Sequence, residues 1–413
     1  MFVLASGAGA ARAIGVLSIP VLTRMYPPEH FGLLAVYVSV LQILLPFSTL
    51  RYLTAIPLPR GNRTAFALLT LSVGLAFSFS IILFILFSVI GSQLLNFFSL
   101  GVLAPFAWLV PLGVLGASLY EALTMWATRI RAYRIIAGTQ IWQATSGEGL
   151  KLLLGMFWGR PVGLLLGHIV GHGGGLRYLF VQFWPEFRRM IPGLRWRHIR
   201  IVALRFRGFP TYRMPAQVLL AMALQAPLLL TAAFYGIETT GQMGLAMTAF
   251  TLPFLLVGQA ASRAYYAETA RLGVNEADKI MEALKKTAFT LGLLAAPVAV
   301  VLFLFAEVGA AFVLGEEWAM SGRFVALLSI SLVPQFVSST VVRTLDVLEA
   351  HRTVVMLHLT RFVVVSAAFI IAARTESAAD SAVLAFSIIL ALHYLLQVAV
   401  IYYFVSRLQR DQS

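Results

Sequence analysis

The sequence predicts an all-α integral membrane protein with about twelve transmembrane helices. Of its 413 residues, 60% are hydrophobic and only 12% are charged, whereas soluble domains carry about 25% charged residues. The apolar residues form successive runs of roughly 20 to 28 residues, long enough to cross a hydrocarbon core of ~30 Å. Because hydrocarbon offers backbone groups no partner, runs without two-residue alternation must form helices rather than barrel strands.

Twelve apolar runs follow one another along the chain. The first begins at the N-terminus with Arg12 inside it and has no small-residue cleavage site before a polar domain, so we expect no removable signal peptide. The longest polar connection follows the sixth run. The predicted spans are residues 2–24, 32–56, 64–90, 102–127, 134–158, 161–183, 210–234, 241–262, 286–312, 322–346, 353–373 and 380–405.

Lysine and arginine segregate between the alternate loops of this arrangement. Of the 31 basic residues, 22 lie in loops on one side of the membrane and five lie inside spans. The other side has only Arg24, Arg160, Arg323 and Arg374. Because cytoplasmic loops carry the excess of Lys and Arg, both termini are predicted to be cytoplasmic. The formal net charge of +14 therefore predicts contact with anionic membrane lipids rather than with nucleic acid.

The two halves of six helices begin alike. The turn after the first span reads Y-x-x-E-x-x-G from Tyr26 to Gly32, and the turn after the seventh reads the same from Tyr235 to Gly241. Both turns fall on the predicted outer side, so we expect parallel repeats with a midplane site between them, a common transporter plan. The predicted divisions are an N-terminal six-helix lobe (1–184), a basic cytoplasmic linker (185–209), a C-terminal six-helix lobe (210–406) and a cytoplasmic tail (407–413).

The linker combines an apolar helical face with a basic flank. This pattern is typical of a helix lying in the headgroup plane, and a solvated basic loop is the alternative. The apolar face consists of Trp196, Ile199, Val202, Ala203 and Phe206, and the flank consists of Arg197, Arg200, Arg205 and Arg207.

Two arginines lie inside predicted spans of the first half. Arg12 is near the middle of the first span, and Arg51 is about five residues before the basic end of the second; neither has an acidic neighbour in sequence. Ionisable groups within a membrane are costly, so both are candidate substrate-binding residues. A guanidinium suits bidentate capture of phosphate. The alternatives are an interhelical hydrogen bond for Arg12 and snorkelling to the interface for Arg51.

The fifth and sixth spans hold two further pairs. Glu148 and Lys151 are spaced i,i+3 and share a helix face, which favours mutual neutralisation. Otherwise Glu148 binds a coupling proton or sodium ion, or Lys151 faces a substrate cavity. His168 and His172 have a spacing that suits a metal, but no acidic or cysteine ligand accompanies them. The nearby glycines favour close helix packing instead.

Fewer candidates lie elsewhere. His358 and Arg361 are spaced i,i+3 in the eleventh span and are candidate substrate-binding residues. Glu121, near the cytoplasmic end of the fourth span, is predicted to pair with Arg129 or Arg131.

The chain has no cysteine and no Walker or Rossmann glycine loop, and every predicted outer loop is short. The sequence therefore predicts no catalytic residue, no metal and no cofactor.

Several segments together resemble the polysaccharide transporter family of bacterial flippases, in the multidrug, oligosaccharidyl-lipid and polysaccharide exporter superfamily. The resemblance runs from the first span into the last third of the chain. One departure is Leu53, where the family often has an acidic residue directly after the Arg-Tyr pair, which puts the role of Arg51 in question. The segments are PVLTRMYPPEHFG (20–32), LRYLTAIPLP (50–59), QIWQ (140–143), GLLLG (163–167), FPTY (209–212) and LGEEWAMSG (314–322).

The resemblance implies two six-helix lobes, an alternating-access cavity and export of a polyprenyl-diphosphate oligosaccharide, such as an O-antigen or other lipopolysaccharide unit, across the bacterial cytoplasmic membrane. Membrane glycan-assembly proteins are implied partners. Our hypothesis is that Arg12, Arg51, Lys151 or Arg361 binds the diphosphate in a cationic cavity between the lobes. A cation-coupled multidrug exporter of the same superfamily is the alternative, and it should rely on membrane acids more than arginines. A membrane glycan polymerase or ligase is disfavoured because no outer domain is predicted.

Overall fold

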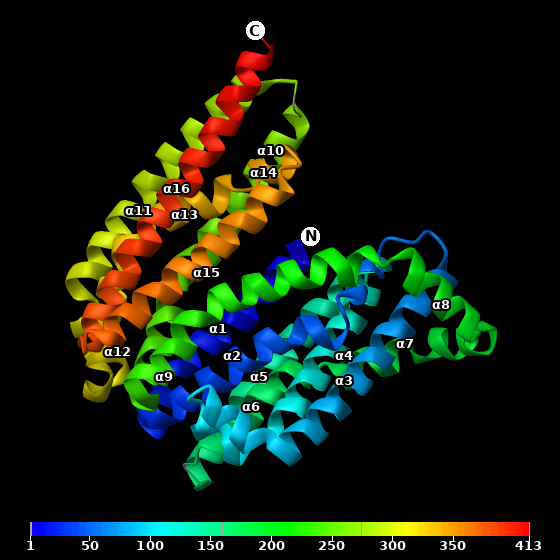
Figure 1. Cartoon of the computed structure of the whole chain (residues 1–413). Helices are drawn as coiled ribbons and strands as arrows, with labels where there is room; N and C mark the ends of the chain where they lie inside the picture. The colour runs from blue at the N-terminus through cyan, green and yellow to red at the C-terminus, as the bar shows by residue number, and fades with distance from the viewer. Residues whose placement is uncertain (1, 159, 274, 413) are drawn as a thin grey trace. The chain divides into compact units, whose positions relative to one another are not determined.

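A computed structural model describes residues 2–158, 160–273 and 275–412 of the chain (Figure 1). Within these residues every regular element is a helix and none is a strand. Nine described segments are long and apolar enough to cross a membrane. The predicted all-α, multi-pass membrane fold is therefore confirmed.

The nine segments account for ten of the twelve predicted spans. One segment, Phe209–Leu252, contains the seventh and the first half of the eighth, which the backbone separates at Gly236, where φ is 85°. A positive φ is readily adopted only by glycine, so this residue can end one helix and start the next. The fifth and sixth predicted spans are also helical, but the fifth carries several charged residues and the sixth is broken.

Contacts divide the chain into two compact units, Met1–Gln225 and Ala226–Ser413. We call these unit 1 and unit 2. The boundary falls inside helix α9, later than the expected start of the C-terminal lobe at residue 210, because the first turns of α9 pack with unit 1. Ser39 of α2 shows this, since its hydroxyl donates to the side-chain oxygen of Gln225 at 3.0 Å.

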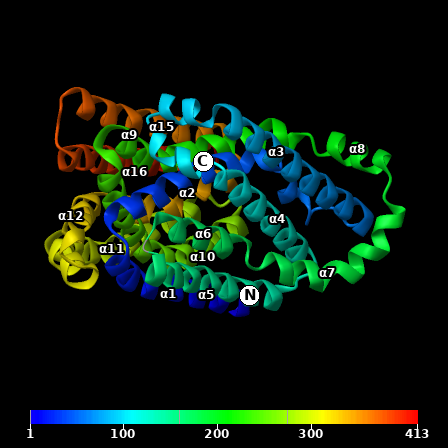
Figure 2. The same cartoon turned by 90° about the horizontal axis from the view of Figure 1, so that it is seen from below.

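Unit 1 consists mainly of long helices with short connections. In it, α1 packs along α5, and α5 packs along α6 (Figure 2). Its helices are α1 (Phe2–Met25), α2 (Pro28–Ser48), η1 (Tyr52–Ala55), α3 (Asn62–Phe97), η2 (Gly101–Phe106), α4 (Leu109–Arg129), α5 (Tyr133–Trp158), α6 (Pro161–Gly173), α7 (Leu176–Met190), η3 (Ile191–Gly193), α8 (Trp196–Arg205) and η4 (Phe209–Arg213).

The sixth predicted span, residues 161–183, is two helices rather than one. Helix α6 ends at Gly173 and α7 begins at Leu176, so Gly174 and Gly175 form a break between them. A Cβ on Gly175 would lie 2.8 Å from the Tyr120 ring and 2.9 Å from Thr139 Cβ. The chain can pass this close to α4 and α5 only because glycine has no side chain, and a hydropathy pattern does not reveal such a break.

The linker helix packs against unit 1. Val202 of α8 is buried in a core formed with α3 and α4, and Ala203 and Phe206 pack beside it. The Tyr52 hydroxyl donates to the Ala203 carbonyl at 3.0 Å. Trp196 is 76% exposed. The expected apolar face is therefore divided, because its C-terminal part covers protein while Trp196 is free to contact lipid.

Unit 2 has a core of large apolar side chains, including Phe324, Phe369 and Phe386. Its elements follow on from α9 (Met214–Pro253). They are η5 (Phe254–Gly258), α10 (Gln259–Leu272), α11 (Ala277–Leu314), η6 (Glu316–Trp318), α12 (Ala319–Leu328), η7 (Ser329–Ser331), α13 (Leu332–Val341), α14 (Thr344–Val347), α15 (His351–Arg374) and α16 (Ala379–Gln412).

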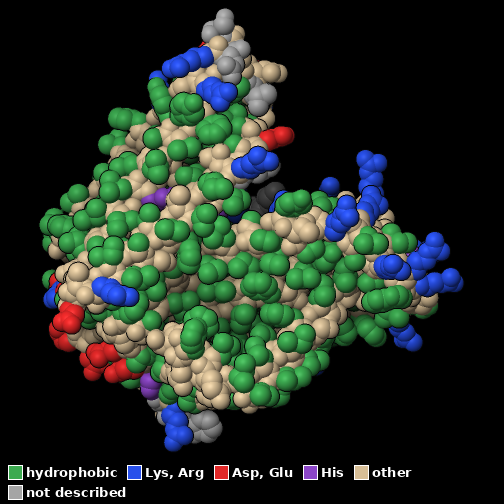
Figure 3. Space-filling model, viewed as in Figure 1, with side chains coloured by type: hydrophobic (Ala, Val, Ile, Leu, Met, Phe, Trp, Pro, Cys, Tyr) green, Lys and Arg blue, Asp and Glu red, His purple; other side chains and the backbone are tan. Residues whose placement is uncertain are grey.

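The surface carries far more apolar side chain than a soluble protein tolerates. Hydrophobic side chains cover most of the face in Figure 3, whereas Lys and Arg gather over α7 and α8. Phe305 and Phe312 of α11 are 62% and 85% exposed. Exposed apolar area on this scale marks a lipid-facing surface, as expected of a multi-pass membrane protein.

Candidate functional site

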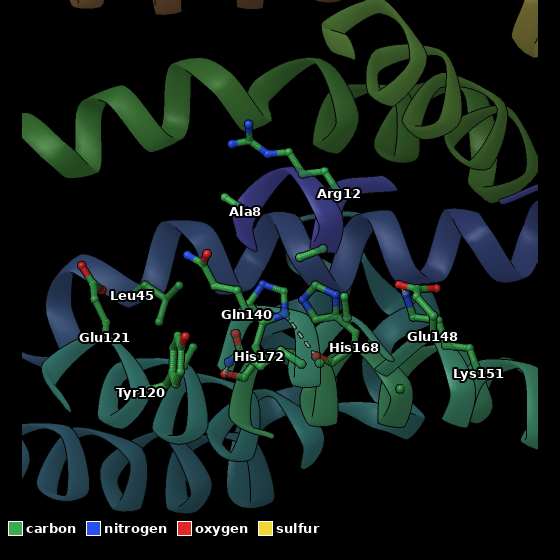
Figure 4. A pocket seen from close by; sticks show the side chains of 16 residues that line it. Ala8, Arg12, Leu45, Tyr120, Glu121, Gln140, Glu148, Lys151, His168 and His172 are labelled. Atoms are coloured by element: carbon green, nitrogen blue, oxygen red, sulfur yellow. Dashed lines mark hydrogen bonds and ion pairs between the residues drawn. The ribbon is translucent and has the colours of Figure 1, made fainter. Parts of the chain in front are cut away.

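Unit 1 contains a cavity of about 580 Å³. Helices α1, α2, α4, α5 and α6 each contribute to its wall (Figure 4). The volume falls within the roughly 300–1,000 Å³ of typical ligand sites. Polar side chains provide much of the lining, namely Arg12, Tyr120, Glu121, Gln140, Gln143, Glu148, Lys151, His168 and His172.

Glycines allow α5 and α6 to approach closely beneath this cavity. A Cβ on Gly147 would lie 2.7 Å from the Cα of Gly171, and a Cβ on Gly167 would lie 2.8 Å from the Gly147 carbonyl oxygen. Small residues at such crossings let membrane helices pack backbone to backbone. The glycine-rich sequence around the histidines therefore serves helix packing, as predicted.

Glu148 and Lys151 form the ion pair that their spacing predicts. The Lys151 ammonium nitrogen lies 2.7 Å from Glu148 Oε1, and the two side chains are 12% and 18% exposed. Ser18 of α1 donates to the other carboxylate oxygen at 3.0 Å. Since both charges are partnered, neither residue adds net charge to the cavity. Ion coupling by Glu148 and substrate binding by Lys151 stay predictions.

Arg51 lies beyond the helix that was expected to contain it. Helix α2 ends at Ser48, and Arg51 has a left-handed backbone with φ of 58° before η1. Its guanidinium lies 3.3 Å from Glu121 Oε1 of α4. The acid that is missing beside Arg51 at Leu53 is thus supplied from another helix, 70 positions away in the sequence.

The prediction that Glu121 pairs with Arg129 or Arg131 is wrong. The Arg129 guanidinium instead donates to the carbonyl oxygens of Pro59 and Arg60 and, at 3.0 Å, to Asn62 Oδ1. Pro59 and Arg60 lie in the connection before α3 and Asn62 is the first residue of α3, so Arg129 ties the start of α3 to the end of α4. Glu121 lies two turns earlier on α4, where Arg51 is the nearer cation.

Arg12 lines the cavity from α1 and is exposed. Its guanidinium extends away from the side chains of Glu148 and Lys151 (Figure 4). Within the described residues it makes no ion pair and no side-chain hydrogen bond, so the interhelical hydrogen bond that was the alternative to an anion site is not formed there. The lining contains two strongly basic side chains, Arg12 and Lys151. Glu148 neutralises Lys151, whereas no described acid neutralises Arg12.

The histidines of α6 contact each other at the cavity wall. The ring centroids of His168 and His172 are 4.1 Å apart, and His172 Nδ1 lies 3.1 Å from the His168 carbonyl oxygen. Tyr37 meets the His168 ring edge-on. Across the described chain, no group of three or more His, Asp or Glu side chains is arranged to hold a metal.

Unit 2 places Arg361 and His358 in a second polar cluster. The Arg361 guanidinium lies over the Tyr394 ring at 5.4 Å, while Arg361 Nε and His358 Nδ1 are buried without a described hydrogen-bond partner. Gln397 bonds His393 at 3.0 Å. The sequence did not single out Tyr394 and Gln397 because neither is charged. Their membership of this cluster follows from their positions on α16, which packs against α15.

The sequence was compared with protein-family models and with known proteins. A family model described as "Polysaccharide biosynthesis protein" matches residues 21–323. The chain belongs to this family. The resemblance that the sequence motifs indicated is therefore confirmed over most of the chain. No curated protein matches the sequence.

Solved structures share the family fold at low identity. A structure titled "Lipid II flippase MurJ, inward closed conformation" has a TM-score of 0.72 at 12% identity and covers 98% of this chain and 90% of its own. An inward-facing MATE family multidrug resistance transporter of the MOP superfamily has a TM-score of 0.65 at 14% identity, over 100% and 96%. A MOP superfamily transporter from Pyrococcus furiosus has a TM-score of 0.55 at 12% identity, over 99% and 96%.

Proposed function

We propose that this protein is a flippase that moves a polyprenyl-diphosphate-linked oligosaccharide from the inner to the outer leaflet of the bacterial cytoplasmic membrane by alternating access. Membership in a polysaccharide biosynthesis family supports a glycan cargo. The fold, which is shared with a lipid II flippase and with multidrug transporters, supports transport as the activity. Membrane proteins of glycan assembly are its proposed partners.

The unbalanced charge of Arg12 is the observation that carries this proposal. In the unit 1 cavity, Lys151 is neutralised by Glu148, and Glu121 is neutralised by Arg51. A planar guanidinium without an acid is suited to bidentate hydrogen bonds with a phosphate. The amides of Gln140 and Gln143 and the hydroxyl of Tyr120 in the same lining suit sugar hydroxyls.

Arg361 and His358 are proposed as a second anion contact in unit 2. The buried Arg361 Nε has a hydrogen to donate and no described acceptor, and no described acid pairs with the guanidinium. An unpaired buried donor costs about 1–3 kcal/mol, so a phosphate oxygen at this position would be stabilising.

A cation-coupled multidrug exporter is the rival function. Binding a cationic drug or a coupling ion favours a free carboxylate. Both carboxylates of the cavity lining, Glu121 and Glu148, already pair with a basic side chain, so the lining favours an anionic cargo.

The test is replacement of Arg12 with Gln in a flippase-deficient strain that makes surface glycan. We expect R12Q to reduce surface glycan roughly tenfold or more, since a lost charge-assisted hydrogen bond costs ~1.5–3 kcal/mol. R12K should retain part of the activity, because it keeps the charge without the planar fork. Surface glycan is measured by immunoblot at matched protein level.

The control is R63Q, because Arg63 is an exposed arginine at the start of α3, outside the cavity. It should leave surface glycan unchanged. Full glycan export by R12Q at normal expression would remove Arg12 from the site. Loss of export in R63Q as well would point to a general charge effect instead.

A further inference from the structure

A second cavity in unit 1, of about 630 Å³, lies where α5 meets the break between α6 and α7. We call it the α5–α7 groove. Gly138 and Trp142 line it from α5, and Arg177, Tyr178 and Val181 line it from α7. It shares no lining residue with the first cavity.

The groove and the first cavity lie on different faces of α5. Gly138 and Trp142 are one turn apart, whereas Gln140 and Ala144, which line the first cavity, follow them by two residues. Two residues turn a helix by about 200°. Thr139, which lines the groove, and Tyr120, which lines the first cavity, share a hydrogen bond of 3.0 Å between their hydroxyls.

Two glycines, which have no side chain, leave the space that forms the groove. A Cβ on Gly138 would meet no atom within 4 Å, whereas a Cβ on Gly174 would lie 2.6 Å from the Val170 carbonyl oxygen. Gly174 therefore permits the break that carries α7 away from α6, and Gly138 leaves the space beside it empty. Besides Thr139 and Arg177, the rest of the wall is aromatic or aliphatic, with Trp142, Tyr178 and Val181 exposed by 61%, 55% and 63%.

Arg177 is the charged group of this apolar space. It is exposed and has no ion pair or side-chain hydrogen bond among the described residues. Arg177 lies on α7, six residues before the cytoplasmic end of the sixth predicted span, 161–183. A long arginine side chain near the end of a span can reach the headgroup layer by snorkelling. Trp and Tyr also concentrate at this depth.

We infer that the α5–α7 groove binds one anionic phospholipid of the surrounding bilayer. Its phosphate contacts Arg177, and an acyl chain lies along Trp142 and Val181 in the space beside Gly138. The charge of Arg177 selects an anionic headgroup, and the apolar walls receive the chain. This site is separate from the proposed cargo site, and its occupancy does not depend on which cargo the protein moves.

The test is lipid binding to the purified full chain in detergent, followed by native mass spectrometry during titration with phosphatidylglycerol or phosphatidylcholine. Gly138→Leu fills the groove without a backbone clash. Its matched control is Gly149→Leu, because Gly149 is also on α5 and also has no atom within 4 Å of a Cβ. Arg177→Gln removes the charge, and Arg188→Gln on the same helix is its control.

The wild type should bind one phosphatidylglycerol molecule more tightly than any further phosphatidylglycerol molecules, and it should bind phosphatidylcholine weakly. G138L and R177Q should each weaken this binding roughly tenfold, and G149L and R188Q should match the wild type. Because Arg177 is exposed, R177Q leaves the buried core unchanged and tests the site even if G138L folds poorly. The inference would be overturned if G138L and G149L bound phosphatidylglycerol equally well, or if the wild type bound phosphatidylcholine as tightly as phosphatidylglycerol. It would also be overturned if polyprenyl monophosphate occupied the site in place of phosphatidylglycerol.

Discussion

A guanidinium inside a membrane protein is costly unless an acid, a carbonyl group or a wet cavity receives it, and the arginines of unit 1 differ in what receives them. Arg129 donates to carbonyl oxygens, and Arg51 pairs with Glu121. Arg12 lines the cavity with no described partner. Pairing therefore distinguishes Arg51, which meets an acid, from Arg12, the proposed cargo contact, a distinction that sequence position alone did not make.

The Arg51–Glu121 pair should stabilise unit 1. We expect R51Q and E121Q each to lower the free energy of unfolding, with a coupling energy of about 1–2 kcal/mol. This value lies between the ~0.2–1 kcal/mol of exposed pairs and the ~3–5 kcal/mol cost of breaking a buried pair, because the side chains are 20% and 33% exposed. A double-mutant cycle from unfolding in detergent measures the coupling. Strictly additive single effects would show that the pair contributes nothing.

Small residues determine how the helices of unit 1 meet. Gly147 and Gly171 bring the α5 and α6 backbones together, and Gly175 brings the start of α7 close to Tyr120 and Thr139. The chain turns away at Gly174, and this turn creates the α5–α7 groove. The same glycine-rich stretch therefore provides both tight packing and an open space, depending on which neighbour each residue faces.

Replacing Gly147 with Val should force α5 and α6 apart. Its Cβ would lie 2.7 Å from the Gly171 Cα, a backbone atom that cannot rotate aside. We expect G147V to lower the free energy of unfolding by about 1–3 kcal/mol, the usual cost of overpacking. G149V makes the same chemical change on α5 in open space and should stay within about 0.5 kcal/mol of the wild type. Thermal unfolding followed by tryptophan fluorescence gives both values, and equal destabilisation would attribute the effect to helix propensity rather than to packing.

At the scale of the whole molecule, the distribution of loop charge predicts the orientation. The connection between α7 and α8 belongs to the strongly basic side, and the connection between α15 and α16 belongs to the side with four basic residues. Because the chain has no cysteine, single cysteines introduced into these connections are free of background labelling.

Gly193→Cys and Ala378→Cys should therefore react differently with a membrane-impermeant maleimide. Both positions are exposed: Gly193 is the last residue of the short η3 in the α7–α8 connection, and Ala378 lies between α15 and α16. Cysteine at 378 should be labelled in intact spheroplasts, whereas cysteine at 193 should be labelled only after permeabilisation. The unmodified protein is the control. Labelling of both positions from outside would mean that an even number of spans, rather than the predicted five, separates residue 193 from residue 378.

Composition and hydropathy alone predicted a helical chain that crosses the membrane many times, and roughly where most of the spans lie. The physical reason is that hydrocarbon thickness and backbone hydrogen bonding leave a run of about 20 apolar residues few alternatives. The i,i+3 pair Glu148–Lys151 was also predictable, because helix geometry places those side chains together. The packing of the helices was needed to show that Glu121 meets Arg51, that the sixth span breaks at Gly174 and that two cavities flank α5. Such features depend on which helix faces are in contact, and hydropathy is nearly the same on every face of a helix surrounded by lipid and protein.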